Sequence, residues 1–381
     1  MSASNMNHVI TRDSSGKVVH KTMSLKEPGP GEIAIRPLYA GVCGTDLQII
    51  RGLRSDPSTI LGHEGTAEVC KVGSAIADFT VGQRVTFNPT NEHNPHDILG
   101  HTIPGIWQHH MIVSQGSLRR GMLVPLNPEV PFLMAPLIEP LAVNIYADQL
   151  IQQQCKPERI VIIGGGTIGL LQILYARMKG YTDITLVSST QERLAWAIER
   201  NIISLDKVML ATADFPMSIQ ERIPGGVDAC YICTTRPTAV TALRQAIELV
   251  RPGGCIDLIG GFADQCTIPE LPDASPGAIR QLNTCGQPQP GIMTSYKTTQ
   301  GKWLWLTGHR GVSSTHLEMA MGLLARHTNY YRAVISHILS LPTAARALET
   351  LRTTQQRQFQ RRECVKMVID CTELHEYMEL L

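Results

Sequence analysis

The sequence predicts an α/β fold in which a β-rich module carries an inserted, doubly wound parallel sheet. Three observations indicate this architecture. The chain has 381 residues, which is long for a single hydrophobic core. Short β-branched runs separated by turn residues fill the segment 1–145. After Arg159, strand patterns and helix patterns alternate, as they do in a parallel sheet with crossover helices.

The β-rich module is predicted from segments such as GEIAIRPLYAGVC, GTAEVCKVG and VGQRVTFNP. Each is short, contains Val, Ile, Thr or aromatic residues, and is bounded by glycine or proline. The segment 312–381 ends in the apolar run CVKMVID, and we assign it to the same module. The expected domains are therefore 1–145 together with 312–381, and a separate domain over 146–311.

The inserted domain is predicted from a series of strands and helices. RIVIIGG indicates a buried strand, and TIGLLQILYARMKG indicates a helix that ends at Gly180. DITLVSS, DKVML, VDACYIC, GCIDLIGG and KWLWLTG indicate further strands with helical segments between them. The segment 263–301 is rich in Pro, Gly and Thr, and we expect an irregular loop there.

Composition excludes several classes of partner. The formal net charge of +1 gives no reason to expect binding to nucleic acid or to an anionic membrane. The polar N-terminal residues lack the apolar core of a secretory signal, and three glycines interrupt the most apolar run. The ten cysteines show no paired framework, which indicates a reducing, cytoplasmic setting. We therefore expect a small-molecule substrate.

The segment GGGTIG predicts a dinucleotide-binding turn, because its glycines have the spacing G-x-G-x-x-G between a strand and a helix. The first glycine allows the tight turn, the second lets a pyrophosphate approach, and the third lets the helix pack on the strand. The helix N-terminus then offers free N–H groups to the phosphates. The residues predicted to contact the cofactor are Gly164, Gly166, Thr167, Ile168, Gly169, Ser188, Ser189, Thr190, Arg193 and Thr234.

The second strand of this domain predicts a preference for NADP(H) over NAD(H). NAD-binding domains usually carry Asp or Glu at the end of that strand, where it accepts hydrogen bonds from the ribose. Here the strand ends on Ser188 and Ser189, and Arg193 follows. Hydroxyl groups and a guanidinium can donate to a 2′-phosphate. The alternative is that the serines only cap the next helix and Arg193 is solvated.

Cys43, His63, Glu64 and Glu139 are residue types that bind zinc. Cys43 lies in GVCGTD, His63 and Glu64 lie in ILGHEG, and Glu139 lies in LIEPLAV. Each also has a structural interpretation, since a single cysteine is usually a buried small residue and a His-Glu pair is usually satisfied by hydrogen bonds.

The segments GVCGTD, GHEG, VGQRV, LIEPLAV and VIIGGGTIG follow one another in the order found in a known family. The chain resembles the zinc-dependent medium-chain dehydrogenase/reductase superfamily, and within it the polyol branch that includes sorbitol and threonine dehydrogenases. The resemblance implies a GroES-like catalytic domain with an inserted Rossmann domain, one catalytic Zn²⁺, and a homodimer or homotetramer. It also implies an active site in the cleft between the two domains.

By the same resemblance, Cys43 and His63 would be zinc ligands and Glu64 the next ligand. Glu139 would be either a ligand or the partner of a water molecule on the zinc. Thr45 would hold the substrate hydroxyl and pass on its proton, and Asp46 would orient His63. The implied catalytic residues are thus Thr45, Asp46 and Glu64. The implied reaction is hydride transfer between NADP(H) and a secondary alcohol or ketone of a polyol, sugar or cyclitol.

The sequence departs from the family pattern in two places. No cysteine lies between Cys70 and Cys155, so we expect no second, structural zinc. The segment found instead contains His93, His96 and His101, which we interpret as solvated loop histidines rather than a substitute metal site. In addition, Gln48 stands where relatives often have a proton-relaying histidine, and an amide cannot titrate.

Three further features admit two interpretations each. Arg54 and Arg310 are either solvated or bind an anionic group of the substrate. Cys230 and Cys233 form a C-x-x-C, but on a buried strand, and we interpret them as packing. The chain as a whole could also be a zinc-free quinone or enoyl reductase, which metal analysis distinguishes. It could also be a nucleotide-binding protein without turnover, which assays on alcohols and ketones distinguish.

Overall fold

The computed structural model describes residues 6–91, 93–94, 97–354 and 356–381, and it divides into two compact units. Unit 1 comprises Met1–Glu139 and Leu317–Leu381, and unit 2 comprises Pro140–His316. Two helices, α3 (Ile138–Gln152) and α9 (Ser314–Arg326), run across the points where the chain passes from one unit to the other. Unit 2 is therefore an insertion in the sequence of unit 1.

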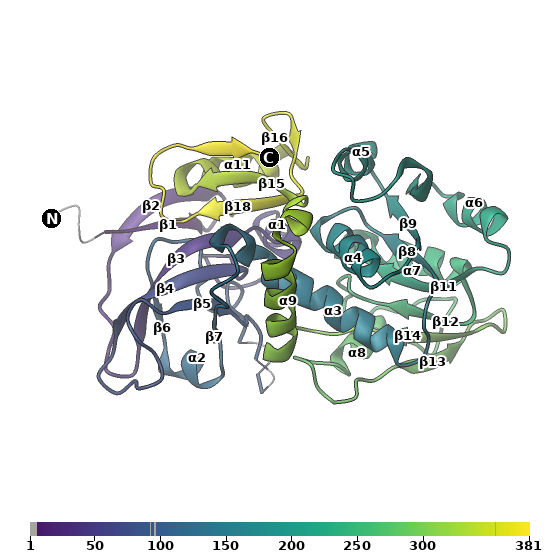
Figure 1. The fold of residues 1–381 in the computed structure, drawn as a ribbon, viewed down its shortest axis with the longest axis horizontal. Coiled ribbons are helices and arrows are strands. Elements are labelled where there is room, and N and C mark those ends of the chain that lie inside the picture. The colour runs from purple at the N-terminus through teal and green to yellow at the C-terminus, as the bar shows by residue number, and fades with distance from the viewer. Residues whose placement is uncertain (1–5, 92, 95–96, 355) are drawn as a thin grey trace. The chain divides into compact units, whose positions relative to one another are not determined.

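Unit 1 is built on an eight-stranded sheet with the order β19-β15-β18-β3-β4-β5-β7, in which β6 also pairs with β3 (Figure 1). The strand β18, from the end of the chain, pairs with β3 from its beginning, and β15 pairs with β18 on the other side. The strands are β3 (Ile33–Gly41), β4 (Gly65–Val72), β5 (Arg84–Phe87), β6 (Met111–Val113), β7 (Leu123–Pro125), β15 (Ile335–Ser340), β18 (Lys366–Asp370) and β19 (Met378–Leu380).

Two small hairpins and short helices complete unit 1. The hairpins are β1 (Met6–Arg12) with β2 (Val18–Ser24), and β16 (Gln358–Phe359) with β17 (Arg362–Glu363). The helices are α1 (Gly44–Ile50), α2 (Gln115–Arg119), the 3-10 helix Phe132–Leu137, α10 (Thr328–Arg332) and α11 (Leu341–Thr354). Helix α11 contacts β1 and β2, and its buried face joins the strands in one hydrophobic core. This core positions the loops that carry the candidate metal ligands.

Unit 2 contains a seven-stranded sheet with the order β10-β9-β8-β11-β12-β14-β13. All the pairs from β10 to β14 are parallel, so the strand order is that of a doubly wound dinucleotide-binding sheet, as the sequence predicted. The strands are β8 (Arg159–Ile163), β9 (Asp183–Ser188), β10 (Val208–Leu210), β11 (Val227–Ile232), β12 (Val250–Asp257), β13 (Thr294–Lys297) and β14 (Trp303–Thr307).

The sheet of unit 2 has apolar central strands because crossover helices accompany it. The strand β8 reads RIVII, and all its residues after Arg159 are buried, as expected of a parallel strand covered on both faces. The helices are α4 (Thr167–Met178), α5 (Gln191–Glu199), the 3-10 helix Leu205–Lys207, α6 (Phe215–Arg222), α7 (Arg236–Leu249) and α8 (Pro276–Gln281). The fold class predicted from the sequence, a β-rich domain with an inserted Rossmann domain, is confirmed.

The segment 263–301 differs from the prediction of an irregular loop, because it contains α8 and β13. The strand β13 pairs in antiparallel register with β14, from Thr294 opposite Leu306 to Lys297 opposite Trp303. A four-residue strand of mixed polarity is stabilised by this pairing rather than by its own pattern. The local sequence therefore gave little indication of it.

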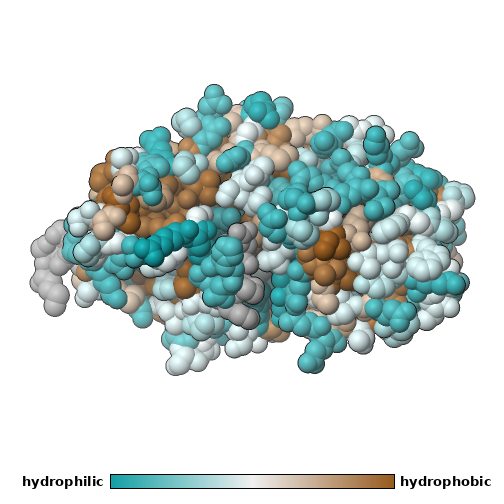
Figure 2. Space-filling model, turned by 90° about the horizontal axis from the view of Figure 1, so that it is seen from below, coloured by the Kyte–Doolittle hydropathy of each residue, from teal (hydrophilic) through white to brown (hydrophobic). Residues whose placement is uncertain are grey.

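Among the described residues, no helix is both long and apolar enough to cross a membrane. Figure 2 shows that the face seen there is mostly hydrophilic, with hydrophobic residues gathered in separate patches.

Candidate metal centre and nucleotide site

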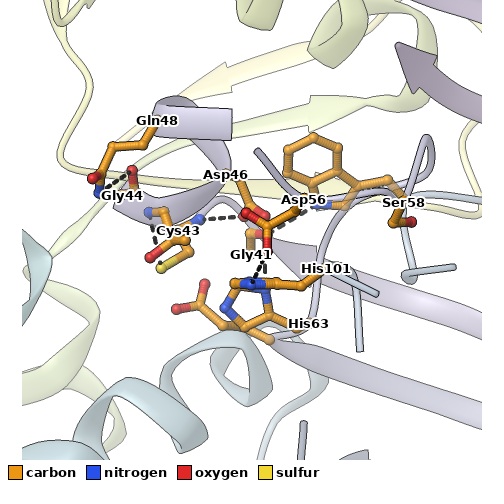
Figure 3. Close-up of polar contacts among 12 residues, drawn as sticks. Gly41, Cys43, Gly44, Asp46, Gln48, Asp56, Ser58, His63 and His101 are labelled. Atoms are coloured by element: carbon orange, nitrogen blue, oxygen red, sulfur yellow. Dashed lines mark hydrogen bonds and ion pairs between the residues drawn. The ribbon is translucent and has the colours of Figure 1, made fainter. Parts of the chain in front are cut away.

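The candidate metal centre begins at the N-terminus of α1, where the sequence CGTD forms a capping box. The Cys43 sulfur accepts a hydrogen bond from the Thr45 backbone N–H at 3.4 Å. In return, the Asp46 Oδ2 atom accepts from the Cys43 backbone N–H at 2.8 Å (Figure 3). Sulfur here takes the place of the usual hydroxyl oxygen. This local motif fixes the positions of Cys43, Thr45 and Asp46 together.

His63 and Glu64 are positioned by the two glycines on either side of them. Gly62 has φ +90°, and a Cβ added to it would lie 2.2 Å from Trp107 Cδ1. A Cβ added to Gly65 would lie 2.2 Å from the carbonyl oxygen of Tyr39. No other residue fits at either position without displacing the backbone or the indole. The segment GHEG therefore packs tightly against the buried Trp107 at one end and against β3 at the other.

These two segments bring Cys43, His63 and Glu64 together, and the donor atoms of the three side chains lie within 4.8 Å of one another. His63 is 7% exposed and Glu64 is 3% exposed. A thiolate, an imidazole and a carboxylate in this spacing fit the ligands that zinc prefers. Three protein ligands leave one tetrahedral position for water or substrate, as in catalytic rather than structural zinc sites.

Asp46 is a buried carboxylate next to His63, and it shifts the pKa of that histidine. Its Oδ1 atom is 3.6 Å from His63 Nδ1, and the side chain has no exposed surface. Burial lowers the pKa of His63, but Asp46 and the Cys43 sulfur outweigh burial and raise that pKa to about 10. Burial raises the pKa of Asp46, and His63 opposes the shift. A metal bound at His63 would displace its proton and meet a histidine oriented by a buried carboxylate.

Lys366 is a part of the site that the sequence analysis missed. It begins β18, has no exposed surface, and donates a hydrogen bond to Glu64 Oε2. A Cβ added to Gly41 would lie 2.6 Å from Glu64 Oε2 and 2.8 Å from Lys366 Nζ, so the ion pair fills the space beside that glycine. The available signal was a lysine inside the apolar run CVKMVID. A charge within a buried strand usually has a buried partner.

His101 is the second missed residue, and the expectation that it is a solvated loop histidine is wrong. It is 6% exposed, and its ring lies edge-on to that of His63 with 5.0 Å between the centroids. Its Nδ1 atom is 3.5 Å from Asp56 Oδ1 and 3.1 Å from Arg54 Nη2. Donor atoms of Asp46, His63 and His101 lie within 4.8 Å of one another (Figure 3). The loop thus buries His101 against the back of the site, whereas His93 is exposed and His96 lies outside the described residues.

Glu139 lies in the first turn of α3 and interacts with the same cluster. Burial and the neighbouring Glu64 carboxylate raise its pKa to about 7, while His63 and Lys366 oppose the shift. Among the described residues, however, Glu139 belongs to neither group whose donor atoms lie within 4.8 Å of one another, which are Cys43 with His63 and Glu64, and Asp46 with His63 and His101. The geometry therefore brings three of the four expected ligands together, and the role of Glu139 stays a prediction.

The remaining residues of unit 1 expected near the substrate are Thr45, Gln48 and Arg54. Thr45 lies in the first turn of α1 and is half-buried. Gln48 donates to the Gly44 carbonyl at 3.4 Å (Figure 3). Arg54 forms two hydrogen bonds with the Asp56 carboxylate, at 2.6 and 3.1 Å. The charge of Arg54 is therefore already balanced, which weakens the hypothesis that it binds an anion.

In unit 2, the glycine loop has the form expected of a dinucleotide site. Gly164 follows β8 with φ +124°, which makes the tight turn. A Cβ added to Gly169 would lie 1.8 Å from the Gly164 carbonyl oxygen, so α4 packs closely on the loop. At Gly166, the nearest atom to an added Cβ is 4.0 Å away, on Arg193, so this glycine borders open space where a phosphate could approach. Thr167 and Ile168 begin α4.

The residues expected at the adenosine end also surround this loop. Ser188 is buried at the end of β9, and a Cβ added to Gly165 would lie 2.8 Å from its hydroxyl. Arg193 is 6% exposed and donates to the Gly165 carbonyl at 3.3 Å. The alternative of a solvated Arg193 is therefore wrong. Ser189 and Thr190 are exposed, and the cap of α5 is Thr190, whose side chain makes no capping hydrogen bond.

Two further predicted residues lie elsewhere in unit 2. Thr234 follows β11, and its hydroxyl is buried with no hydrogen-bond partner among the described residues, which fits a site for a bound ligand. Arg310 pairs with Asp264 at 2.5 Å. Like Arg54, it already has a carboxylate partner, and its proposed contact with an anionic substrate stays a prediction.

Comparison with known proteins places these two sites in a family. The family "Alcohol dehydrogenase GroES-like domain" matches residues 29–125, and "Zinc-binding dehydrogenase" matches residues 167–279. Sorbitol dehydrogenase from Homo sapiens is 28% identical over 284 residues, which cover 69% of this chain and 76% of that protein. A zinc-binding dehydrogenase from Sinorhizobium meliloti 1021 bound to NADP has a TM-score of 0.70, with 19% identity over 96% of this chain and 99% of its own.

A protein described as a short chain alcohol dehydrogenase from Escherichia coli CFT073, complexed with NADH, has a TM-score of 0.72 at 18% identity and covers 96% of this chain and 99% of its own. At such identities the solved structures establish the fold alone. The fold and the family matches together define a zinc-binding dehydrogenase with a GroES-like and a Rossmann domain. The chain belongs to the zinc-dependent medium-chain dehydrogenase/reductase superfamily, and its relatives include sorbitol and threonine dehydrogenases.

Proposed function

We propose that this protein is a zinc-dependent oxidoreductase that transfers a hydride between NADP(H) and a secondary alcohol or ketone of a polyol, sugar or cyclitol. The observation that carries the proposal is the convergence of Cys43, His63 and Glu64, with donor atoms within 4.8 Å of one another. Zinc-free reductases of this fold do not need that set of ligands. We infer that unit 1 is the catalytic domain and unit 2 the nucleotide-binding domain.

Cys43, His63 and Glu64 would hold the zinc, which when bound polarises an alcohol or ketone oxygen. Asp46 keeps His63 in one orientation through its Oδ1 atom, 3.6 Å from Nδ1. Lys366 donates a hydrogen bond to Glu64 Oε2, so a buried cation holds the carboxylate that would bind the metal. In this interpretation the lysine limits the charge of the site and fixes the direction of Glu64.

Two side chains are suited to move the proton that accompanies hydride transfer. The Thr45 hydroxyl lies two residues from Cys43 in the same capping turn, where it can hold a substrate hydroxyl and pass on its proton. Glu139 is a second carboxyl group next to this cluster, where burial and the Glu64 carboxylate raise its pKa, and such a group can accept or release a proton. Gln48 cannot titrate and instead hydrogen-bonds to Gly44, so it does not continue a relay.

The nicotinamide cofactor, when bound, supplies or takes the hydride. The open space at Gly166 and the N-terminus of α4 are suited to its pyrophosphate. Ser188, Ser189, Thr190 and Arg193 follow the glycine loop, where they would bind the adenosine 2′-phosphate of NADP. The proposed preference rests on the guanidinium beside Gly165 and on a strand that ends without a carboxylate.

The zinc proposal is tested by metal analysis and by turnover on a panel of polyols and ketones. We expect about one zinc per chain and no second site. Cys43→Ala should lose both zinc and turnover and keep its fold, whereas Cys70→Ala, a half-buried cysteine of β4 outside the cluster, should keep all three. A Cys43→Ala variant with wild-type zinc content and turnover would show that the assignment is wrong.

The cofactor proposal is tested by the ratio of kcat/KM for NADP(H) and NAD(H). We expect NADP(H) to be preferred by the wild-type enzyme. Ser189→Asp places a carboxylate at an exposed position beside the loop, and it should shift the ratio toward NAD(H) by roughly tenfold or more. Ser188→Asp should act in the same direction, but it also introduces a charge at a buried position. A wild-type preference for NAD(H) contradicts the proposal.

We also infer a homodimer or homotetramer, an expectation that rests on the family resemblance, and a reducing cytoplasmic setting, which rests on ten cysteines whose spacing shows no disulfide framework. Light scattering at micromolar concentration tests the first inference, and a monomer would contradict it.

A further inference from the structure

Three buried side chains of unit 1 gather beside the candidate metal centre, and each has a polar atom without a hydrogen bond. Among the described residues, Asp46 Oδ1, His63 Nδ1 and His101 Nε2 have no hydrogen-bond partner. One donor atom from each of these side chains lies within 4.8 Å of the other two (Figure 3). Burying a polar atom without a partner costs free energy, so nearby charges and dipoles must offset that cost. His101 has no part in the function proposed above, and its place in this cluster therefore requires an explanation.

The backbone around His101 is bound to the segment that carries His63. The Ser58 N–H donates to the His101 carbonyl at 2.8 Å, and the Ile106 N–H donates to the Gly62 carbonyl at 3.0 Å. One of these bonds involves His101 itself, and the other involves the residue before His63. The two rings lie edge-on to each other with 5.0 Å between their centroids. Backbone hydrogen bonds therefore hold the two imidazoles in contact, independently of any metal.

Arg54 determines which ring nitrogen of His101 carries the proton. Its Nη2 atom is 3.1 Å from His101 Nδ1. A guanidinium can only donate, so Nδ1 accepts and the proton is on Nε2. Asp56 Oδ1 is 3.5 Å from the same Nδ1, at the outer limit of a hydrogen bond, and this oxygen already accepts from Arg54 at 3.1 Å. The Nε2–H group of His101 is therefore left for the cluster with Asp46 and His63.

The geometry points to His101 as a positioning residue whose Nε2–H stabilises the buried Asp46 carboxylate, an inference that rests on the zinc site proposed above. Asp46 Oδ1 is 3.6 Å from His63 Nδ1 and holds the His63 ring. A histidine that is oriented by a carboxylate is a better metal ligand than one that is free to turn. Arg54 acts at the other end of this series of contacts, because it fixes the tautomer of His101. Zinc affinity should therefore depend on two side chains that do not contact the metal.

The first experiment measures the zinc affinity of full-length variants by competition with a chelator. His101→Phe keeps an aromatic ring against His63 but has no N–H group, and it should weaken zinc binding by roughly tenfold or more. His101→Gln places an amide donor near the position of Nε2 and should recover most of this loss. His93→Leu, which replaces an exposed histidine of the same segment, should bind zinc as the wild type does.

Cobalt substitution distinguishes positioning from a general loss of structure. Co²⁺ accepts the same ligands as Zn²⁺, and its visible absorption bands report the geometry of the ligands. We expect these bands to be displaced in His101→Phe and restored in His101→Gln. A purely structural role would instead lower the thermal midpoint of the metal-free protein and leave the bands of the folded protein where they are in the wild type.

Arg54→Met tests whether the arginine acts through His101. Without the guanidinium, the His101 proton can move to Nδ1 beside Asp56, and Nε2 then presents a lone pair to the Asp46 carboxylate. Zinc affinity should fall, whereas Arg54→Lys keeps a group that can only donate and should retain most of the affinity. In the His101→Phe background, Arg54→Met should have little further effect.

Two results would overturn the proposal. One is a His101→Phe variant with wild-type zinc affinity and wild-type cobalt bands. The other is an equal loss of zinc affinity on Arg54→Met with His101 present and with His101 replaced, and this comparison of Arg54→Met with Arg54→Lys remains decisive if His101→Phe does not fold. A wild-type protein that binds no zinc would overturn the proposed function, and this inference with it.

Discussion

Replacing Lys366 with methionine tests the electrostatic design of the metal centre. Lys366 and Glu64 are hydrogen-bonded, and they are 0% and 3% exposed. Methionine has a similar length but no charge, so the variant leaves the Glu64 carboxylate buried without its cation. Removing one partner of a buried ion pair costs about 3–5 kcal/mol. We therefore expect a loss of about 4 kcal/mol in the free energy of unfolding of unit 1.

The assay is urea denaturation in the presence of a chelator, combined with hydrogen exchange of the strand amides of unit 1, because a protein with two units need not unfold in one step. A bound zinc supplies positive charge next to Glu64. The destabilisation by Lys366→Met should therefore be smaller in zinc-loaded protein than in chelated protein.

Two control variants isolate the charge. Lys366→Arg keeps the cation and should lose less stability than Lys366→Met. The double variant Glu64→Gln, Lys366→Met removes both charges and should regain most of the loss. The reasoning is refuted if Lys366→Met costs less than about 1 kcal/mol in chelated protein, which is the range of an exposed ion pair. It is also refuted if the double variant is no more stable than the single one.

Three further predictions concern chemistry, pH and packing. Thr45→Val should lower kcat by roughly 100-fold or more, because valine has no hydroxyl to transfer the proton, whereas Thr45→Ser keeps a hydroxyl and should retain much of kcat. Steady-state kinetics check this prediction. An unchanged kcat in Thr45→Val would remove Thr45 from the mechanism. Burial lowers the pKa of His337 to about 4, so the unfolded state binds more protons in acid. The neutral His337 side chain contributes fully to stability above about pH 6.5, and this contribution is lost as the pH falls toward 4. His337→Gln should therefore flatten the dependence of the unfolding free energy on pH in that window. A slope equal to that of the wild type would contradict this. Gly62→Ala should displace Trp107, whose Cδ1 lies 2.2 Å from the added Cβ. The free energy of unfolding should fall by more than about 1 kcal/mol. A variant with wild-type stability and zinc content would show that the loop adapts to the methyl group.

The sequence by itself determined those features that depend on residues close together in the chain. The parallel sheet follows from the apolar run of β8 and the alternation after it, because buried strands and crossover helices have distinct periods. The glycine loop follows from the spacing of its glycines. A Cβ at Gly164 or Gly169 would meet neighbouring backbone, whereas Gly166 borders open space. The capping box of Cys43 and Asp46 likewise involves only four consecutive residues.

Only the tertiary structure decided the contacts between distant segments. Lys366 reaches Glu64 across 302 positions, and the pattern of CVKMVID indicates a strand without showing which carboxylate its lysine meets. His101 lies in a polar segment typical of a solvated loop, and it is buried only because that loop folds against His63. Strand register and loop packing set these distances, and both depend on the burial of surfaces contributed by the whole chain, which a local pattern does not specify.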